Sequence, residues 1–449
     1  MRAQSLFPVL LVSWWLTSGC ASSSRDRAWL DAQLNDRLGG TTGGEDARRA
    51  VRWPEDVTLE DGLDEREVVA LALTRSPMLR ADLARIDAAR ASLDEANRPA
   101  NPQLSLMGPF GPVTAVATLL APLESLWQMP DRAAAAARDA DAAGESALMS
   151  ALTIARDARL LHVELALAQD RAAVRTALRM AADELARVGE VRARLGEATP
   201  LEAELLAVDA SNAIDAATIA DNDVIMARAR LSAALALDDA QTSGDWRAVF
   251  EGETAVVDVA LDQLLAAARS LRPDARAAEI AIDAAASRAG WERSRVIALG
   301  ALVEGQWSEA IGPSLRVGAR LDLPIFGLNP GGIGRAEAEI LRATALLDVT
   351  IQTVASEVRV AHARALQAER SRRLFDAEVL PSLEASLRMA QAGFLAGDAP
   401  SLIVLDVLRR ISEARLRRAD LVAEARRARA ELERAIGGRL ARVTRQETP

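Results

Sequence analysis

Two copies of one sequence pattern occupy most of this chain. The matched markers are Ile86-Asp87-Ala88-Ala89 with Ile282-Asp283-Ala284-Ala285, Pro77 with Pro273, the only two histidines, His162 with His362, and Gly196-Glu197-Ala198 with Gly397-Asp398-Ala399. The offset is 196 residues for the first two pairs (from 86 to 282), 200 for the histidines (from 162 to 362) and 201 for the last pair (from 196 to 397). A copy this long is no solenoid repeat, so a whole half-molecule is duplicated. Two such halves predict a pseudo-symmetric assembly around an axis.

The composition favours long helices over a bulky globular core. Hydrophobic residues make up 50% of the 449-residue chain and charged residues 26%, so the chain can fold. Aromatic residues make up only 3%, and tyrosine is absent. The segments rich in Ala, Leu, Arg and Glu are typical of long helices that pack closely through small side chains. A formal net charge of −10 argues against binding to nucleic acid.

The first 20 residues have the pattern of a targeting segment. Arg2 precedes an apolar run from Leu6 to Leu16, which is too short to span a bilayer. The run ends in Thr17-Ser18-Gly19-Cys20, which resembles a bacterial lipoprotein cleavage site and makes Cys20 the candidate for lipidation. The alternative is an ordinary secretory signal with an incidental cysteine. Because Cys20 is the only cysteine, an intrachain disulfide and a cysteine-based metal site are excluded.

Each repeat predicts the same order of elements. In the first repeat we expect helix over 63–97 with a break at Ser76-Pro77, strands at 103–107 and 113–119, a helix over 130–195 of about 97 Å, and a helix from Pro200 to about Leu237. In the second we expect helix over 261–295, strands at 296–307 and 315–323, a helix over 331–395 and a helix over 401–436. A short helix at Arg27–Leu38 and a flexible Gly-rich linker at 39–44 precede the first repeat.

Little in the sequence predicts an enzyme. No Ser-His-Asp set, phosphate loop or pair of catalytic carboxylates is present, and the chain has two histidines and one cysteine. His162 and His362 could form a metal-binding belt in an oligomer, but each lacks a partner at helical spacing, which favours packing or wall-lining. Gly331-Gly332-Ile333-Gly334 lacks the strand and acidic residue of a nucleotide site. The sequence therefore predicts no cofactor apart from the lipid on Cys20.

Two segments resemble the TolC-like outer-membrane efflux and secretion channels. Leu321-Asp322-Leu323-Pro324-Ile325-Phe326-Gly327, followed by Gly334-Arg335-Ala336-Glu337, is similar to that family's passage from strand to helix. Gly393 to Leu402, followed by Val404-Leu405-Asp406-Val407-Leu408, is similar to its helix-turn-helix tip. With the duplication, the resemblance covers residues 60–437.

The resemblance implies a fold, partners and a location. The fold is mainly α with a small β part: duplicated long helical hairpins form a trimeric α-barrel tunnel, and four strands per protomer form a 12-stranded outer-membrane β-barrel. The implied partners are two further copies (a homotrimer), a periplasmic adaptor, an inner-membrane transporter and outer-membrane lipid. The implied place is the bacterial outer membrane, with the tunnel extending into the periplasm. The first strand pair falls short of the roughly 9–11 residues of a transmembrane strand, and the aromatic residues near the strands are few.

The resemblance also implies a role for the two turns between long helices. Glu197 and Asp398 would contribute six acidic groups to a gate at the periplasmic tip of a trimer, where they favour cations. The alternative is solvated turn residues beside helix N-termini. Gly196, Ala198, Gly397 and Ala399 would form the docking surface for the adaptor. Gly196 and Gly397 also fit the ordinary use of glycine at a helix C-terminus.

The resulting domain prediction has six parts: signal peptide 1–19, lipid-anchored segment and linker 20–60, first repeat 61–237 with its hairpin at 103–123, equatorial insert 238–260, second repeat 261–437 with its hairpin at 296–325, and C-terminal tail 438–449. The predicted function is a passive trimeric exit duct in a tripartite efflux or type I secretion-like system. The alternative is a lipid-anchored periplasmic coiled-coil scaffold without a pore. The exported substrate is left open.

Overall fold

The computed structural model describes residues 21–39, 57–108, 113–238, 244–250, 259–308, 312–322, 324–325, 327–396, 398 and 401–441. The chain divides into two compact units. The sheet unit comprises Met1–Leu30, Ala81–Leu148 and Pro273–Gln352, and the hairpin unit comprises Asp31–Arg80, Met149–Arg272 and Thr353–Pro449. Each unit therefore contains matching parts of both repeats. No helix within the described ranges has the length and apolarity needed to cross a membrane.

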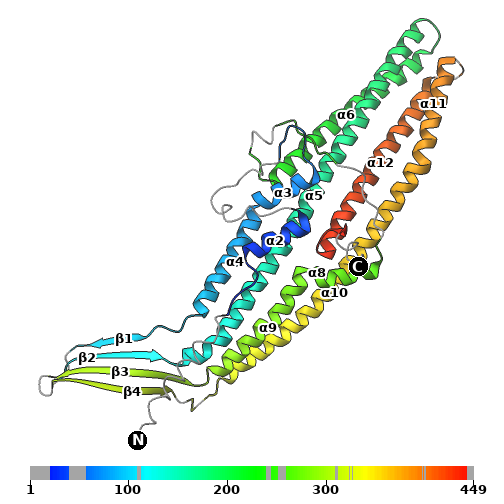
Figure 1. Ribbon diagram of the computed structural model, residues 1–449. Helices are drawn as coiled ribbons and strands as arrows, with labels where there is room; N and C mark the ends of the chain where they lie inside the picture. The colour runs from blue at the N-terminus through cyan, green and yellow to red at the C-terminus, as the bar shows by residue number, and fades with distance from the viewer. Residues whose placement is uncertain are drawn as a thin grey trace. The chain divides into compact units, whose positions relative to one another are not determined.

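The helices and one sheet follow the predicted order (Figure 1). The elements are α2 (Arg27–Leu38), α3 (Glu65–Arg75), α4 (Pro77–Ala96), β1 (Gln103–Met107), β2 (Val113–Pro122), α5 (Glu124–Arg194) and α6 (Pro200–Ala234), then α8 (Leu261–Leu271), α9 (Pro273–Ser294), β3 (Ala298–Ser308), β4 (Gly312–Asp322), α10 (Pro330–Leu374), the π-helix η2 (Phe375–Val379), α11 (Leu380–Ala396) and α12 (Ser401–Ile436). In Figure 1, α5 pairs with α6 in one helical hairpin and α11 pairs with α12 in another.

The duplication extends to the backbone bonds that end the helices. Both repeats open on two helices that separate just before a proline, at Pro77 and at Pro273. The residue before each proline donates its backbone N–H to the carbonyl oxygen four residues earlier. Ser76 donates to Ala72 and Arg272 donates to Ala268, each at 3.0 Å. Proline cannot continue this bonding and disfavours helical geometry in the residue before it. The break predicted at residue 76 is confirmed.

The two repeats meet in a single antiparallel sheet of order β1-β2-β3-β4. The central pairing joins β2 of the first repeat to β3 of the second, from Val113 opposite Ser308 to Pro122 opposite Gly300. This pairing carries β2 three residues past its predicted end at Leu119. The prediction of a very short second strand is therefore wrong, because the register with β3 extends it.

Two further boundaries differ from the sequence prediction. The helix predicted from Pro130 begins at Glu124, and Pro130 lies inside it. A proline removes only its own N–H bond, so the preceding turn can still form when packing supports it. The helix predicted over 331–395 runs from Pro330 to Ala396, but the π-helix η2 divides it into α10 and α11, which the sequence prediction missed.

Between its histidine and its tip, the long helix of the second repeat is one residue longer than that of the first repeat. The π-helix η2 accommodates this extra residue. Leu380 donates its backbone N–H to the carbonyl of Phe375, five residues back. Pro381 follows at once and has no N–H to give to Ala377. The repeat offset is 200 before this point, at the histidines, and 201 after it, at the tip glycines. A single wide turn of the i to i+5 kind absorbs one extra residue and leaves the helix otherwise intact.

Small side chains form the core of the hairpin unit, as the composition predicts. One cluster joins α8, α10 and α12 through buried alanines that include Ala268, Ala361 and Ala428. Between α5 and α6, a Cβ added at Gly189 would lie 2.5 Å from Leu206 Cδ1. Leu206 would have to change conformation to admit a side chain at position 189, so Gly189 allows Leu206 to pack directly against α5.

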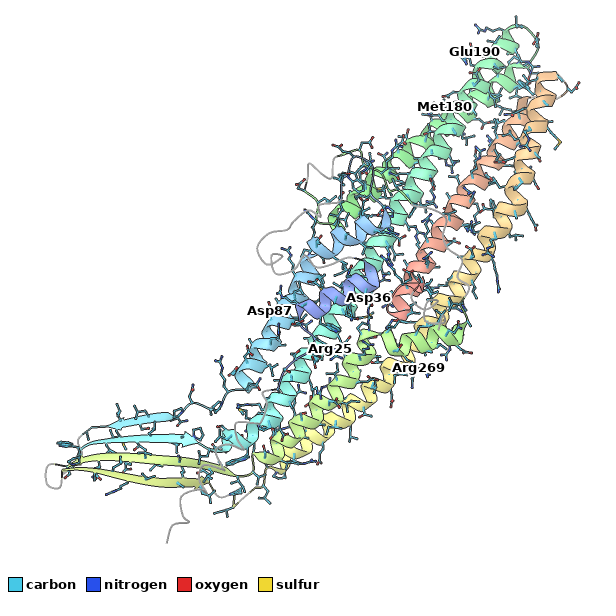
Figure 2. The ribbon with its side chains drawn as sticks, in the orientation of Figure 1. Arg25, Asp36, Asp87, Met180, Glu190 and Arg269 are labelled. Carbon is cyan, nitrogen blue, oxygen red and sulfur yellow. The ribbon has the colours of Figure 1, made fainter. Side chains whose placement is uncertain are left out.

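The segment before α2 lies against the sheet unit. Asp141 of α5 accepts hydrogen bonds from the Ser23 hydroxyl at 2.9 Å, the Ser24 N–H at 3.0 Å and the Arg25 N–H at 3.1 Å. Figure 2 labels Arg25, beside α5, and Asp87, on α4. Asn97 exchanges two hydrogen bonds with the backbone of Ala21, at 3.1 and 2.9 Å. Ala21 therefore lies next to the segment that leads into β1, and the predicted lipidation position, Cys20, lies outside the described residues.

Candidate functional site

The first predicted tip is a turn closed by a glycine. Gly196 has φ +77°, a conformation that favours glycine. Its N–H donates to Ala193 at 3.1 Å, and the Glu197 N–H donates to Arg192 at 2.8 Å. This pair of bonds is the Schellman motif, which satisfies carbonyls at the end of α5. Open space surrounds the position where Gly196 would carry a Cβ, so the backbone is accessible there.

The chain restarts as α6 immediately after this turn. Thr199 is the N-cap, and its hydroxyl accepts the N–H of Glu202 at 3.2 Å. Glu197 lies in the turn with 62% of its side chain exposed, 3.8 Å from Arg192. Ala198 is half-buried. The predicted turn, N-cap and Pro200 start are confirmed, and they present a short stretch of backbone flanked by small side chains.

The second tip repeats the bond pattern of the first where it is described. Asp398 is exposed, and its N–H donates to Gly393 at 2.9 Å. Donor and acceptor are five residues apart, as are Glu197 and Arg192 in the first tip. Glu197 and Asp398 therefore occupy equivalent turn positions. Gly397 and Ala399 lie outside the described residues.

Within the hairpin unit the two tips are in contact below their turns. The Arg192 guanidinium lies over the Phe394 ring, 5.8 Å from its centroid, within the range of cation–π attraction. Deeper along the helices, Leu185, Leu206 and Leu405 form a buried cluster. These contacts fix the two hairpins to each other close to the predicted gate residues.

The sheet presents one continuous apolar face. Residues that share a face alternate along each strand, so the register fixes which residues lie together. This face carries Leu104 and Leu106 of β1, Ala115, Ala117, Leu119 and Ala121 of β2, Leu299, Ala301, Val303, Gly305 and Trp307 of β3, and Leu315, Val317, Ala319 and Leu321 of β4. Several of its large side chains are strongly exposed, Leu106 at 73% and Val317 at 79% among them. Such a face is stable only against lipid or another protein surface.

The opposite face of the sheet is mixed. It carries Gln103, Ser105 and Met107 of β1, Val116, Thr118 and Leu120 of β2, Gly300, Leu302, Glu304 and Gln306 of β3, and Ser314, Arg316, Gly318, Arg320 and Asp322 of β4. Arg316 pairs with Glu304 across the strands at 3.6 Å, and Arg320 pairs with Asp322 at 3.1 Å. All of the sheet's charged side chains are on this face. β2, β3 and β4 have 10, 11 and 11 residues, within the roughly 9–11 of a tilted membrane strand, whereas β1 has 5.

Comparison with known proteins agrees with this geometry. Residues 264–438 match the family model described as outer membrane efflux protein. A membrane protein from Pseudomonas aeruginosa superposes with a TM-score of 0.71 at 21% identity, covering 84% of this chain and 90% of that one. The outer membrane protein VceC from Vibrio cholerae gives 0.69 at 17% identity, covering 84% and 96%. The CmeC outer membrane channel of Campylobacter jejuni gives 0.71 at 14% identity, covering 87% and 90%. No curated protein matches the chain.

The predicted resemblance to the TolC-like channels is confirmed. Both repeats are covered by these superpositions, which show that the chain has the TolC-like fold. The matched family consists of channel proteins rather than enzymes. Two exposed surfaces of this fold are candidates for a function: the apolar face of the sheet and the turns at the hairpin tips.

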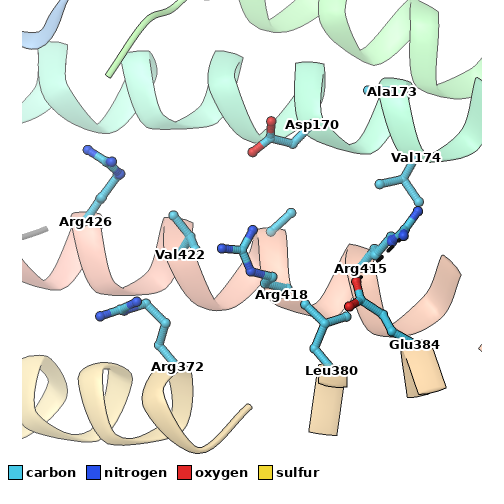
Figure 3. Close-up of a pocket in the computed structure, with 11 residues that line it drawn as sticks. Asp170, Ala173, Val174, Arg372, Leu380, Glu384, Arg415, Arg418, Val422 and Arg426 are labelled. Carbon is cyan, nitrogen blue, oxygen red and sulfur yellow. Dashed lines mark ion pairs between the residues drawn. The ribbon is translucent and has the colours of Figure 1, made fainter. Parts of the chain in front are cut away.

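An arginine-rich hollow of about 480 Å³ lies between α5, α10, α11 and α12 of the hairpin unit (Figure 3). Its lining includes Arg372 of α10, Arg415, Arg418 and Arg426 of α12, and Asp170 of α5. Partial burial raises the pKa of Asp170, against the opposing attraction of Arg418 and Arg426.

The charges around the hollow are mostly paired. Asp376 of η2 accepts from Arg418 at 2.9 Å and from Arg372 at 3.1 Å, so one carboxylate joins the π-helix to α12. Arg426 lies 3.5 Å from the centroid of the Phe250 ring. The hollow is therefore a network of ion pairs beside η2 rather than an apolar ligand pocket. The sequence contains two signals for η2 itself, the change of repeat offset from 200 to 201 and Pro381.

His162 has a packing role. It is fully buried on α5, and its Nε2 lies 2.8 Å from the carbonyl oxygen of Leu63. Because a carbonyl only accepts, Nε2 carries the proton. The ring meets Phe250 edge-on, with centroids 4.8 Å apart. Burial lowers the pKa of His162 below 6.5, although Leu63, Glu65 and Asp64 favour its charged form. His362 is half-buried, and no group of three or more metal-ligand side chains occurs in the described part of the chain.

His162 predicts a loss of stability on acidification. Its pKa is lower in the folded chain than in the unfolded chain, so its contribution is complete above pH 6.5 and is lost as pH falls through the folded-state pKa. Below 6.5 the loss from this residue should reach about 1.4 kcal/mol per pH unit. We expect His162→Gln, which can still donate to Leu63, to flatten the fall in thermal midpoint between pH 7 and pH 5. Equal slopes for both proteins would assign the acid sensitivity to other groups.

Proposed function

We propose that the chain is the outer-membrane channel of a tripartite efflux system. It would be a passive trimeric exit duct for substrates delivered by an inner-membrane transporter and a periplasmic adaptor. The observation that carries the proposal is the sheet, with a continuous exposed apolar face, a face that holds all its charges, and three strands of 10 or 11 residues. Placed in a bilayer, such strands bury the apolar face in lipid and turn the charged face toward water.

The same geometry supports assembly with further copies of the chain. β1 and β4 are the outer strands of the sheet, and each has one side without a partner in the described chain. An unpaired strand edge with apolar side chains is unstable in lipid, so the edges of neighbouring copies must pair. Three copies correspond to the predicted assembly, in agreement with the match to the outer membrane efflux protein family.

The proposal predicts both a mass and a conductance. Purified in detergent, the protein should have the mass of three chains, and in planar bilayers it should form discrete conducting channels. In a periplasmic scaffold the exposed apolar sheet face would have to pack against another protein surface. A stable trimer that inserts but never conducts would favour the scaffold and would overturn the duct.

Cys20 is proposed to carry a lipid that places the chain at the outer membrane. The support is the apolar run with small residues before a lone cysteine, together with the attachment of residues 21–25 to Asn97 and Asp141 of the sheet unit. Incorporation of labelled palmitate into the wild-type chain, and its loss in Cys20→Ser, tests this.

The tips are proposed as the gate and the adaptor contact. Glu197 and Asp398 occupy equivalent exposed positions, which would give six carboxylates at one mouth of a trimer. Gly196, Ala198, Gly397 and Ala399 would let a partner hairpin approach the backbone.

Neutralising both acids, as Glu197→Gln with Asp398→Asn, should lower the cation preference of the pore, because like charges at a narrow mouth attract counterions. The measurement is the reversal potential across a salt gradient, which should move toward zero. Glu279→Gln, an exposed change on α9 of the sheet unit, is the control. An unchanged reversal potential in the tip variant would leave these residues as solvated turn positions.

A further inference from the structure

Another hollow, of about 300 Å³, lies between α4, α5 and α9 of the sheet unit. It is close to the strands, because α4 ends at Ala96 before β1 begins at Gln103, and α9 ends at Ser294 before β3 begins at Ala298. α5 enters the hollow from its own first turns, just after β2. A volume of this size is at the lower end of those that hold small molecules.

Two charges in the lining of this hollow are not neutralised. Arg288 of α9 and Asp139 of α5 neutralise each other, since one guanidinium nitrogen donates to both carboxylate oxygens at 2.6 Å. Arg132 of α5 donates instead to two main-chain carbonyls at the end of α4, at 3.1 and 2.6 Å, and forms no ion pair with a described carboxylate. Glu95 of α4 is exposed and forms no ion pair within the described ranges. The hollow therefore offers one cation and one anion.

Trp291 of α9 adds a hydrogen-bond donor to the same lining. Its indole N–H is buried and has no acceptor among the described residues. The guanidinium of Arg295 lies 5.0 Å from the ring centroid, within the range of cation–π attraction, which holds the ring in place. A buried donor without an acceptor destabilises the folded chain, and an acceptor held in the hollow would remove that cost.

The hollow and the N-terminal segment (residues 21–30) lie on opposite sides of α4 and α5. On α4 the segment contacts Asp87, Arg90 and Asn97. The hollow is lined on α4 by Ser92, Glu95 and Ala96. On α5 the segment contacts Asp141 and Glu145. The hollow is lined on α5 by residues that include Arg132, Ala135 and Asp139. At about 100° per residue, the two sets point in opposite directions from each helix.

We propose that this hollow binds small zwitterions on the inner wall of the duct. The ammonium group of the solute meets Glu95, and its carboxylate accepts from Arg132 and from the Trp291 indole N–H. Hydrogen bonds between charged groups are stronger than neutral ones, so a solute with both charges has an advantage over a solute with one.

The N-terminal segment defines the inner side of the wall. It follows Cys20, whose proposed lipid must reach the membrane, so this side of α4 and α5 is the outer one and the hollow opens on the interior. That placement rests on the proposed duct and its lipid anchor. The preference for zwitterions rests on the hollow alone.

Three related solutes test the charge preference: the zwitterion 4-(aminomethyl)benzoate and its single-charge counterparts benzylamine and benzoate. Binding to the purified full-length protein in detergent is measured by saturation-transfer NMR titration. The zwitterion should bind about tenfold more tightly than either counterpart. Glu95→Gln should remove this advantage and leave the affinity for benzoate unchanged.

Two further variants separate the site from general effects on α4 and α9. Trp291→Phe keeps an aromatic ring and removes the N–H, so it should weaken the zwitterion and benzoate alike, by about 2–10-fold. Asp94→Asn is the matched control: it removes the same charge one residue from Glu95, but Asp94 is exposed on the side of α4 that carries Asp87. This control should bind all three solutes as the wild type does.

The outcomes distinguish the site from the proposed function. Equal affinities of the zwitterion for the wild type and Glu95→Gln, or no preference over benzylamine and benzoate, would overturn the site. In planar bilayers the zwitterion should lower the single-channel current of the wild type and of Asp94→Asn, but not that of Glu95→Gln. Binding in detergent without any change of current would overturn the inner-wall placement. Binding to a protein that never conducts supports the site and rejects the duct.

Discussion

Replacing Arg159 with methionine is expected to destabilise the protein by about 3–5 kcal/mol, because the change leaves a carboxylate buried without its main partner. Arg159 of α5 donates to Glu433 of α12 at 2.8 Å, and the side chains are 8% and 7% exposed. Arg159 also lies 3.0 Å from Glu65, at the start of α3. One guanidinium therefore holds three helices of the hairpin unit together.

The chain provides a matched control on the same two helices. Arg171 of α5 pairs with Asp420 of α12 at 2.6 Å, but its side chain is 46% exposed. Exposed pairs contribute only about 0–1 kcal/mol, so Arg171→Met should change stability little. The comparison is made from denaturant midpoints in detergent at one protein concentration, because assembly affects the apparent stability. Similar shifts for both variants would show that burial does not decide the value of these pairs.

The order of helices and strands was predictable because local signals mark their ends. Prolines at 77 and 273 separate the opening helices, and the Gly196 turn with Thr199 and Pro200 fixes the first tip. α12 begins and ends at the predicted residues. Where partners distant in sequence decide the structure, prediction failed. β2 is extended by β3 from the other repeat, and Arg159 meets Glu433 274 positions away in sequence.

The sequence predicted where the two tip turns lie in the chain, but it did not predict which side chains contact one another around them and around η2. The repeat identified Glu197 and Asp398 as equivalent turn residues, because it aligns both tips. It did not reveal the ion pairs around η2, since these depend on which helix faces meet. The clearest missed signal is numerical: the offset grows from 200 to 201 between the histidines and the tips, and one extra residue inside a continuous helix must widen a turn.

The other large expected effect concerns Arg37 of α2, which is 1% exposed. Its Nη1 donates to the carbonyl of Leu271 at 2.7 Å and to that of Gly437 at 2.9 Å, and its Nε donates to Gln33 at 3.1 Å. The two carbonyls end α8 and α12, where the helix dipoles favour a cation. A single buried side chain thus caps two helices of the second repeat.

We expect Arg37→Ala to destabilise the protein by about 2–6 kcal/mol, since each buried carbonyl left without a donor costs about 1–3 kcal/mol. The first repeat supplies the control. Arg75 donates to Leu235 at 3.2 Å and to Ala236 at 2.6 Å at the end of α6, but it is only half-buried, so water can replace it. Arg75→Ala should therefore lower the denaturant midpoint less than Arg37→Ala does. A smaller effect at Arg37 than at Arg75 would mean that α2 does not stabilise these helix ends and that other contacts of the hairpin unit hold them.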